Sequence, residues 1–153
     1  NYYLRQEKNL DLFINYCQSN FLLNKYITLD KEKLIRVFNI YKKDICKYAE
    51  INNIAKIYFN EKFETSINEK FQEEFNNCFN DFLKLINNIN NWEYDFINLK
   101  IKDFLKKNNI KFPILGKPIR YLLTNNYNGP SIIEIFMILG KKQSLERLNK
   151  YKI

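Results

Sequence analysis

The chain has 153 residues, 46% of them hydrophobic and 16% aromatic, which is enough for one folded domain or two small helical ones. Three glycines and three prolines are too few for a turn-rich β-sandwich or barrel, and they cannot form a glycine-rich phosphate-binding loop. The lack of histidine excludes Ser-His-Asp and Cys-His catalysis and leaves no imidazole to bind a metal. No apolar run approaches the roughly 18 residues of a membrane-spanning helix, so we expect no membrane partner.

The net charge of +8 is gathered towards one end of the sequence. Residues 1–99 carry 13 basic and 14 acidic side chains, whereas residues 100–153 carry 12 basic and three acidic ones. A positive excess concentrated in this way favours a polyanionic partner, because neutralising phosphates releases counterions. The alternative is a lysine-rich solvated surface that reflects an AT-rich genome, although that bias would also have raised the charge of the first 99 residues.

The three cysteines, Cys17, Cys46 and Cys78, are odd in number and lie far apart in the sequence. We expect them to be reduced and to act as small hydrophobic residues rather than to form a disulfide. Reduced cysteines would indicate that the protein resides in a reducing compartment.

Apolar residues recur at helical spacing along most of the chain. A short stripe covers residues 10–17. Asp30 is placed to cap a second helix over 31–48, and Leu29 and Leu34 are spaced for a hydrophobic staple across this cap.

The middle of the chain continues with a helix over 51–58 and then with the longest predicted helix, which opens at a capping box of Ser66 and Glu69. Asn91 is expected to cap the helix after that. The inner face of this next helix is predicted to consist of Trp92, Phe96, Leu99 and Phe104. Such aromatic and aliphatic rows indicate a hydrophobic core rather than a cofactor site.

The helical spacing of apolar residues is interrupted at Phe112-Pro113. Proline disfavours the α region for the residue before it, so a break is expected here. Three short helices are predicted after this break, at about 115–124, 131–139 and 141–150. Gly140 lies where a left-handed helix stop is needed. The predicted fold class is all-α.

Five sequence elements follow one another in the segment 111–148. They are Lys117-Pro118-Ile119-Arg120, Leu123-Thr124, Gly129-Pro130 followed by Ile132-Ile133-Glu134-Ile135, Leu139-Gly140-Lys141, and Leu145-Glu146-Arg147-Leu148. In this order and spacing they closely resemble the C-terminal anticodon-binding region of bacterial-type glutamyl-tRNA synthetases. The likeness extends back to Trp92, whose predicted helix has the family's length and position.

The resemblance implies the anticodon-binding domain of a class I aminoacyl-tRNA synthetase, with a helical cage and a small C-terminal helical bundle. Residues 1–90 would form the cage, and residues 91–153 would form the basic second subdomain. The change in charge and helix length near residue 90 agrees with this boundary. The N-terminal sequence Asn-Tyr-Tyr-Leu-Arg is similar to the end of the family's stem-contact region, one residue short.

The resemblance assigns Arg120 to the first two anticodon bases, a role that suits its planar, permanently charged fork. The alternative for Arg120 is a salt bridge to Glu134 or Glu146. Gly129 and Pro130 lead into a helix whose N-terminus would present free N–H groups to the RNA.

By the same resemblance, the side chains of Pro130, Ile132 and Ile133 form an apolar wall against the bases. The alternative is an ordinary helix start, in which both isoleucines pack inside the domain. Lys117, Lys141 and Lys142 are the expected phosphate-binding residues.

Two positions depart from the family's pattern. Asn125 replaces the glycine that usually follows the Leu-Thr pair, but asparagine tolerates the left-handed conformation needed there. Asp44 takes the place of the arginine that reads the third anticodon base in many discriminating enzymes. A carboxylate can accept a hydrogen bond from a cytosine amine but cannot replace a guanidinium. We therefore expect a tRNA of the glutamate type, and also of the glutamine type, as partner.

The catalytic motifs of the family, a His-x-x-His-like element and a Lys-x-Ser-Lys-like loop, are missing. The chain is therefore expected to be a non-catalytic, monomeric anticodon-binding fragment without a cofactor of its own. The parent enzyme would attach glutamate to tRNA with ATP and Mg. The composition places it in the cytoplasm of an AT-rich bacterium, or in an apicoplast, plastid or mitochondrion of an AT-rich eukaryote. The competing hypothesis is an all-α protein-interaction domain whose basic tail binds an acidic partner.

Overall fold

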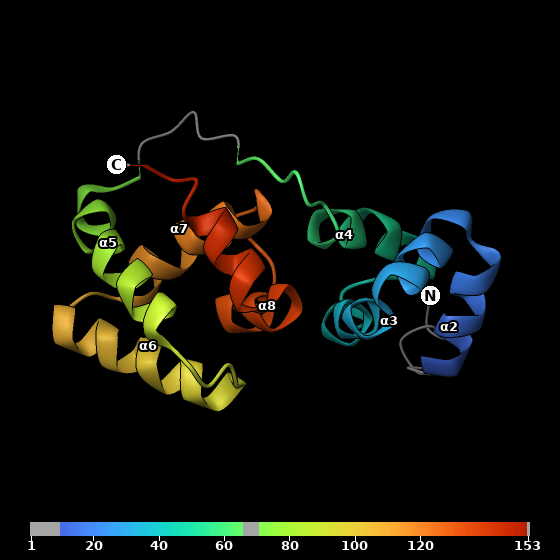
Figure 1. The fold of residues 1–153 in the computed structure, drawn as a ribbon, viewed down its shortest axis with the longest axis horizontal. Coiled ribbons are helices and arrows are strands. Elements are labelled where there is room, and N and C mark those ends of the chain that lie inside the picture. The colour runs from blue at the N-terminus through green and yellow to red at the C-terminus, as the bar shows by residue number, and fades with distance from the viewer. Residues whose placement is uncertain (1–9, 66–70, 153) are drawn as a thin grey trace. The chain divides into compact units, whose positions relative to one another are not determined.

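The structure is a computed structural model that describes residues 10–65 and 71–152 (Figure 1). Within these ranges the chain forms helices and no strand, which confirms the predicted all-α class. The helices are α2 (Leu10–Ser19), α3 (Phe21–Tyr41), the short 3₁₀ helix η1 (Tyr48–Glu50), α4 (Ile51–Tyr58), α5 (Glu73–Asn88), α6 (Tyr94–Asn108), α7 (Phe112–Thr124) and α8 (Ile132–Leu148). No helix in the described part is long and apolar enough to cross a membrane.

The chain divides into two compact units, Asn1–Glu61 and Lys62–Ile153. The boundary expected near residue 90 therefore differs from the one that the structure has. The reason is α5, which packs against α6, α7 and α8 within the second unit. Its buried phenylalanine face meets the C-terminal part of the chain, where the ring of Phe79 lies 5.1 Å from that of Tyr151.

The first unit has a core of aromatic rings carried by α2, α3 and η1. Phe13 stacks on Phe38, with ring centroids 4.1 Å apart, and the ring of Tyr48 contacts both. α2 and α3 bury apolar side chains because their hydrophobic residues recur every three or four positions, whereas Tyr48 of η1 is half-buried. The predicted stripe over 10–17 thus provides two core residues, Phe13 and Cys17.

A kink at Asp30 divides α3 into two helical segments, as the cap predicted at this residue requires. Asp30 has extended backbone angles, and its side chain accepts a hydrogen bond from the Lys33 amide at 2.9 Å. The predicted staple across this cap is wrong, because the side chain of Leu29 is 63% exposed while that of Leu34 is fully buried.

The second unit corrects one of two predictions about helix starts and leaves the other untested. The predicted Ser66–Glu69 capping box lies outside the described residues. The helix expected from Asn91 begins at Tyr94, with Glu93 at the N-cap position.

The buried face of α6 differs in part from the predicted one. The buried residues are Ile97, Ile101 and Phe104, spaced by four and three positions, whereas Leu99 is 55% exposed. Phe104 is therefore confirmed and Leu99 is wrong. Trp92 precedes the helix, where its indole N–H donates to the carbonyl oxygen of Phe136 at 3.2 Å and its ring contacts the Phe136 ring. The apolar residues on both sides of α6 made either face plausible from sequence.

The last two helices follow the predicted pattern closely. α7 starts at Phe112, three residues earlier than predicted, because Pro113 occupies the first turn, where its missing N–H costs nothing. Asn125 ends α7 in the left-handed conformation, with φ 56°. Gly140 has φ 73° and interrupts α8, so the two predicted helices are present on either side of it.

Candidate nucleic-acid interface

The loop that connects α7 to α8 is held by the side chain of Arg120. Its Nε–H donates to the carbonyl oxygen of Pro130 at 2.8 Å, and its Nη1 donates to the carbonyl oxygen of Tyr127 at 2.9 Å. Two of the five N–H groups of a guanidinium make these bonds. Arg120 is half-buried, so it can fix the loop and still present other N–H groups to a ligand.

Other bonds within the loop add to this order. The side-chain amide of Asn125 donates to the carbonyl oxygen of Glu64 at 2.8 Å. The side-chain oxygen of Asn126 accepts from the backbone N–H of Asn128 at 3.0 Å. Gly129 has φ 135°, a conformation that residues with a side chain rarely adopt. Residues 125–129 are exposed, so the loop is an ordered and accessible surface.

A reciprocal capping box opens α8 directly after the loop. Ser131 Oγ accepts from the Glu134 amide at 3.2 Å, and the Glu134 carboxylate accepts from the Ser131 amide at 2.9 Å. Glu146 lies 4.0 Å from the ammonium of Lys142. Among the described residues, neither acid forms an ion pair with Arg120, so the salt-bridge alternative is not what the structure has.

The two isoleucines predicted to line the site do not reach its surface. Ile132 is fully buried and Ile133 is 5% exposed, so both pack in the core of the second unit. This is the ordinary helix start that the sequence left open, and the expectation of an apolar wall is corrected for these two residues. Pro130 is half-buried at the edge of the loop and keeps its place beside Arg120.

The predicted phosphate-binding lysines have three different surroundings. Lys117 is exposed on α7, and Lys142 is exposed on α8 with Glu146 at its side. The ammonium of Lys141 donates to the carbonyl oxygen of Ile89 at 2.7 Å, which satisfies the C-terminal end of α5. Lys141 therefore anchors α8 to α5, and its phosphate role stays a prediction.

Asp44 belongs to the first unit and is described there by itself. It is exposed in the turn that follows α3, where its amide donates to the carbonyl oxygen of Tyr41 at 2.8 Å. Its side chain is thus accessible to a ligand, and its role at the third base stays a prediction.

Sequence reasoning missed a group of aromatic residues beside the loop. The ring of Tyr127 stacks on that of Tyr121 with centroids 4.4 Å apart, and the edge of Phe71 meets Tyr121 at 6.2 Å. Next to this group lies a groove of about 250 Å³. Its lining residues are Phe71, Gln72, Pro113, Ile114, Lys117, Pro118 and Tyr127. The available signal was the pair of tyrosines that flank Leu123-Thr124.

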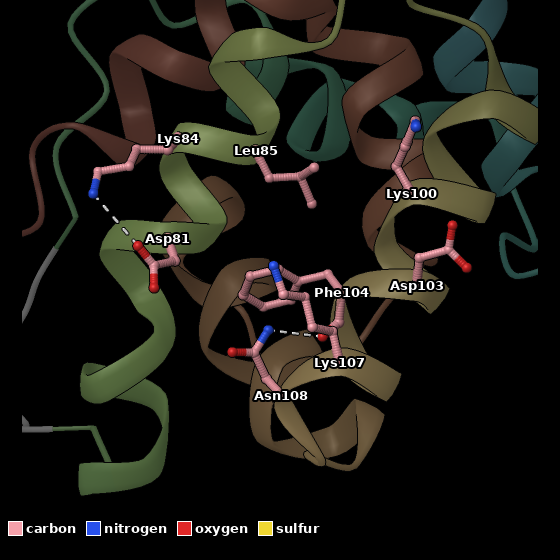
Figure 2. A pocket seen from close by; sticks show the side chains of 8 residues that line it. All are labelled: Asp81, Lys84, Leu85, Lys100, Asp103, Phe104, Lys107 and Asn108. Atoms are coloured by element: carbon pink, nitrogen blue, oxygen red, sulfur yellow. Dashed lines mark hydrogen bonds and ion pairs between the residues drawn. The ribbon is translucent and has the colours of Figure 1, made fainter.

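A larger hollow of about 510 Å³ lies between α5 and α6 (Figure 2). Leu85 and Phe104 provide its apolar surface, and the charged side chains around them are of both signs. They are Lys84, Lys100, Lys107, Asp81 and Asp103. Lys84 is paired with Asp81 at 3.4 Å, so this hollow is much less selective for anions than its lysines suggest.

The interface contains no metal centre within the ranges that the structure describes, where no group of three Cys, Asp or Glu side chains could hold an ion.

Behind the loop, the buried guanidinium of Arg147 donates to the carbonyl oxygen of Leu123 at 2.6 Å and lies 3.9 Å from the ring centre of Phe63. The surface therefore offers ordered backbone, guanidinium N–H groups, aromatic rings and lysines, which are the groups that bind single-stranded RNA.

The helical fold of this chain matches one that is known from a longer protein. A crystal structure of glutamate-tRNA synthetase from Elizabethkingia anophelis matches 97% of this chain with a TM-score of 0.72, at 17% sequence identity. The match covers 30% of that longer chain.

Sequence comparison defines the family. The model of the anticodon binding domain family matches residues 12–152, and the chain belongs to this family. The glutamate–tRNA ligase of Mesoplasma florum is 32% identical over 139 residues, which is 84% of this chain. That of Pelagibacter ubique is 26% identical over 148 residues, or 95% of this chain. The chain spans about 30% of the length of these relatives, 29% and 31% respectively.

Proposed function

We propose that this chain binds the anticodon loop of a glutamate-accepting tRNA and serves as the non-catalytic recognition part of a glutamate–tRNA ligase. The family match over residues 12–152 is the observation that carries this proposal. The chemistry of the second unit supports it, because an exposed, ordered loop lies beside a guanidinium in a lysine-rich part of the sequence.

In this proposal Arg120 has two tasks. It holds the carbonyl groups of Tyr127 and Pro130, and it offers its remaining N–H groups to the exposed edges of unpaired bases. Lys117 and Lys142 provide sequence-independent attraction to phosphates. ATP, Mg and the chemical step belong to the rest of the ligase. Asp44, in place of an arginine, favours acceptance of glutamine-type anticodons as well.

The test is a binding titration of the 153-residue chain against anticodon stem-loops of the glutamate type at several salt concentrations. Log affinity should fall with log salt by about 0.7 to 0.9 for each phosphate contacted. A stem-loop with a scrambled anticodon is the matched RNA control. A response to salt that is flat, with no preference between the two RNAs, would support an acidic protein partner instead.

Two variants distinguish recognition of the anticodon bases from electrostatic attraction to the phosphates. Arg120→Ala should remove most of the preference for the glutamate anticodon, whereas Lys142→Ala should weaken both RNAs alike and reduce the salt slope by about 1. Arg36→Ala is the control, because Arg36 is an exposed arginine in the first unit that is paired with Glu32. If Arg120→Ala left the anticodon preference unchanged, the role of Arg120 in recognition would be withdrawn.

A further inference from the structure

The groove of about 250 Å³ beside the loop is a separate feature from the Arg120 site. It runs along the first turns of α7, which contribute Pro113, Ile114, Lys117 and Pro118. The start of α5 forms one side with Phe71 and Gln72, and Tyr127 completes the wall. The groove is thus built by three segments that are distant in sequence, all within the second unit.

The aromatic wall of the groove is supported from behind. Tyr121 covers one face of the Tyr127 ring at an interplanar angle of 20°, and Tyr121 itself does not line the groove. Tyr127 is 36% exposed, so part of this residue is accessible to a ligand. A ring that is already packed on one side loses little freedom when a second planar group stacks on it.

The backbone of Tyr127 is fixed at the same time. Arg120 Nη1 holds the carbonyl oxygen of Tyr127, and Tyr127 also lines the groove. One residue therefore joins the two features. A nucleotide bound in the groove would be a near neighbour of a base held by Arg120.

The charge of the groove favours an anion. Among the residues that the structure describes, Lys117 is the one charged side chain in the lining, and it is exposed. The hollow between α5 and α6 differs in this respect, because Asp81 and Asp103 line it together with lysines. A stacking surface with a single ammonium at its rim matches a nucleotide, whose base stacks and whose phosphate is attracted to the lysine.

We infer that this groove binds one unpaired base of an RNA loop, stacked on Tyr127, with the adjoining phosphate at Lys117. The inference rests on the proposed function and adds a second nucleotide position to it. Because every base has a π-face, this position tolerates any base and contributes affinity rather than anticodon specificity.

The experiment uses the 153-residue chain and the glutamate-type stem-loop, with a fluorescent purine analogue placed at one loop position at a time. Tyr127→Leu should weaken binding by about fivefold or more for both the matched and the scrambled anticodon. Tyr127→Phe should retain wild-type affinity, because it keeps the ring. Tyr94→Leu is the matched control, since Tyr94 is 43% exposed on α6 and lies outside the groove.

A stacked analogue should be quenched by the wild-type chain at one loop position, and Tyr127→Leu should abolish this quenching. Lys117→Gln should weaken binding and reduce the salt slope by about 0.7 without removing the quenching. If wild-type chain binds RNA and Tyr127→Leu binds equally well, the groove assignment is overturned while the proposed function stands. Equal losses in Tyr127→Leu and Tyr94→Leu would also overturn it, and failure of the wild-type chain to bind RNA would overturn both proposals.

Discussion

The two compact units differ in what they bury. The core of the first unit is apolar, with Phe13, Phe38 and Tyr58 among its largest buried side chains. In the second unit, three polar side chains are buried as well, Thr124, Ser144 and Arg147. Thr124 and Arg147 bond to backbone carbonyl groups of α7, at Arg120 and Leu123. These two bonds fix the backbone of α7 more narrowly than apolar packing does, and this is the unit that presents the ordered loop.

The charge does not follow the same division. Residues 1–61 carry ten basic and seven acidic side chains, a net charge of +3, which leaves +5 for residues 62–153. Within the second unit, residues 62–99 carry three basic and seven acidic side chains, and residues 100–153 provide the excess of nine. The uneven distribution of charge along the sequence therefore lies within the second unit and is not a difference between the two units.

The largest expected effect tests whether the two units unfold separately. Phe13→Ala and Phe82→Ala each remove a fully buried ring, one from each unit, and each should cost about 3–5 kcal/mol of unfolding free energy. Hydrogen exchange measured by segment should show lost protection over 10–61 for the first variant and over 71–152 for the second. Loss of protection in both ranges from either single variant would mean that the units form one cooperative structure.

The next effect concerns the buried cation that distinguishes the second unit. Arg147→Met should destabilise this unit by about 2 kcal/mol, because the carbonyl oxygen of Leu123 would lose its donor and Phe63 its cation. Arg36→Met is the control, with an expected change within about 0.5 kcal/mol, since Arg36 is exposed. Chemical denaturation followed by circular dichroism measures both, and equal costs would remove the distinction between a buried and a surface arginine.

Sequence patterns were most informative where local chemistry decides the conformation. The cap at Asp30, the left-handed Asn125 and the break at Gly140 each depend on a residue's own backbone preferences or short side chain, and all three are present. The α6 face was predicted wrongly at Leu99 because apolar residues lie on both sides of this helix, and packing against α5 and α8 decides which side is buried. The unit boundary was missed because it depends on which distant helices α5 packs against.

The candidate site shows the same limit. The loop and Arg120 lie together as their spacing suggests, but the hydrogen bonds from Arg120 to the loop carbonyl groups could not be read from the sequence. Two adjacent isoleucines, Ile132 and Ile133, show no periodicity from which their exposure could be predicted. Both are buried because α8 packs against α5, α6 and α7. The groove at Tyr127 requires Phe71, which is more than 50 residues away in the sequence.

Ionisation of a buried thiol allows the core of the first unit to be examined by pH. Burial raises the pKa of Cys17 from 9.0 to about 12. Above pH 9 the thiol ionises in the unfolded chain but not in the folded one, so its contribution to stability is complete below pH 9 and is lost as the pH rises towards 12. The loss should be about 1.4 kcal/mol at pH 10.

The measurement is the unfolding free energy of wild type and Cys17→Ala between pH 7 and 11, by denaturant titration. Cys17→Ala should be less stable at neutral pH but should lose less stability as the pH rises, because the other titrating groups are common to both proteins. Parallel pH profiles for wild type and Cys17→Ala would show that this core admits solvent.

The smallest expected effect compares one helix cap in each unit. Asn20 accepts a single bond from the Leu23 amide at 3.1 Å, whereas Ser131 and Glu134 cap α8 by two reciprocal bonds. Asn20→Ala and Ser131→Ala should each cost about 1 kcal/mol of unfolding free energy. The Ser131 variant should also loosen the loop that ends at this cap, because the same residue fixes where α8 begins. Hydrogen exchange over 125–135 would detect this loosening. Glu134→Gln is the control and should not loosen the loop, because glutamine keeps an acceptor oxygen. If Ser131→Ala left exchange in this segment unchanged, the order of the loop would depend on Arg120 alone.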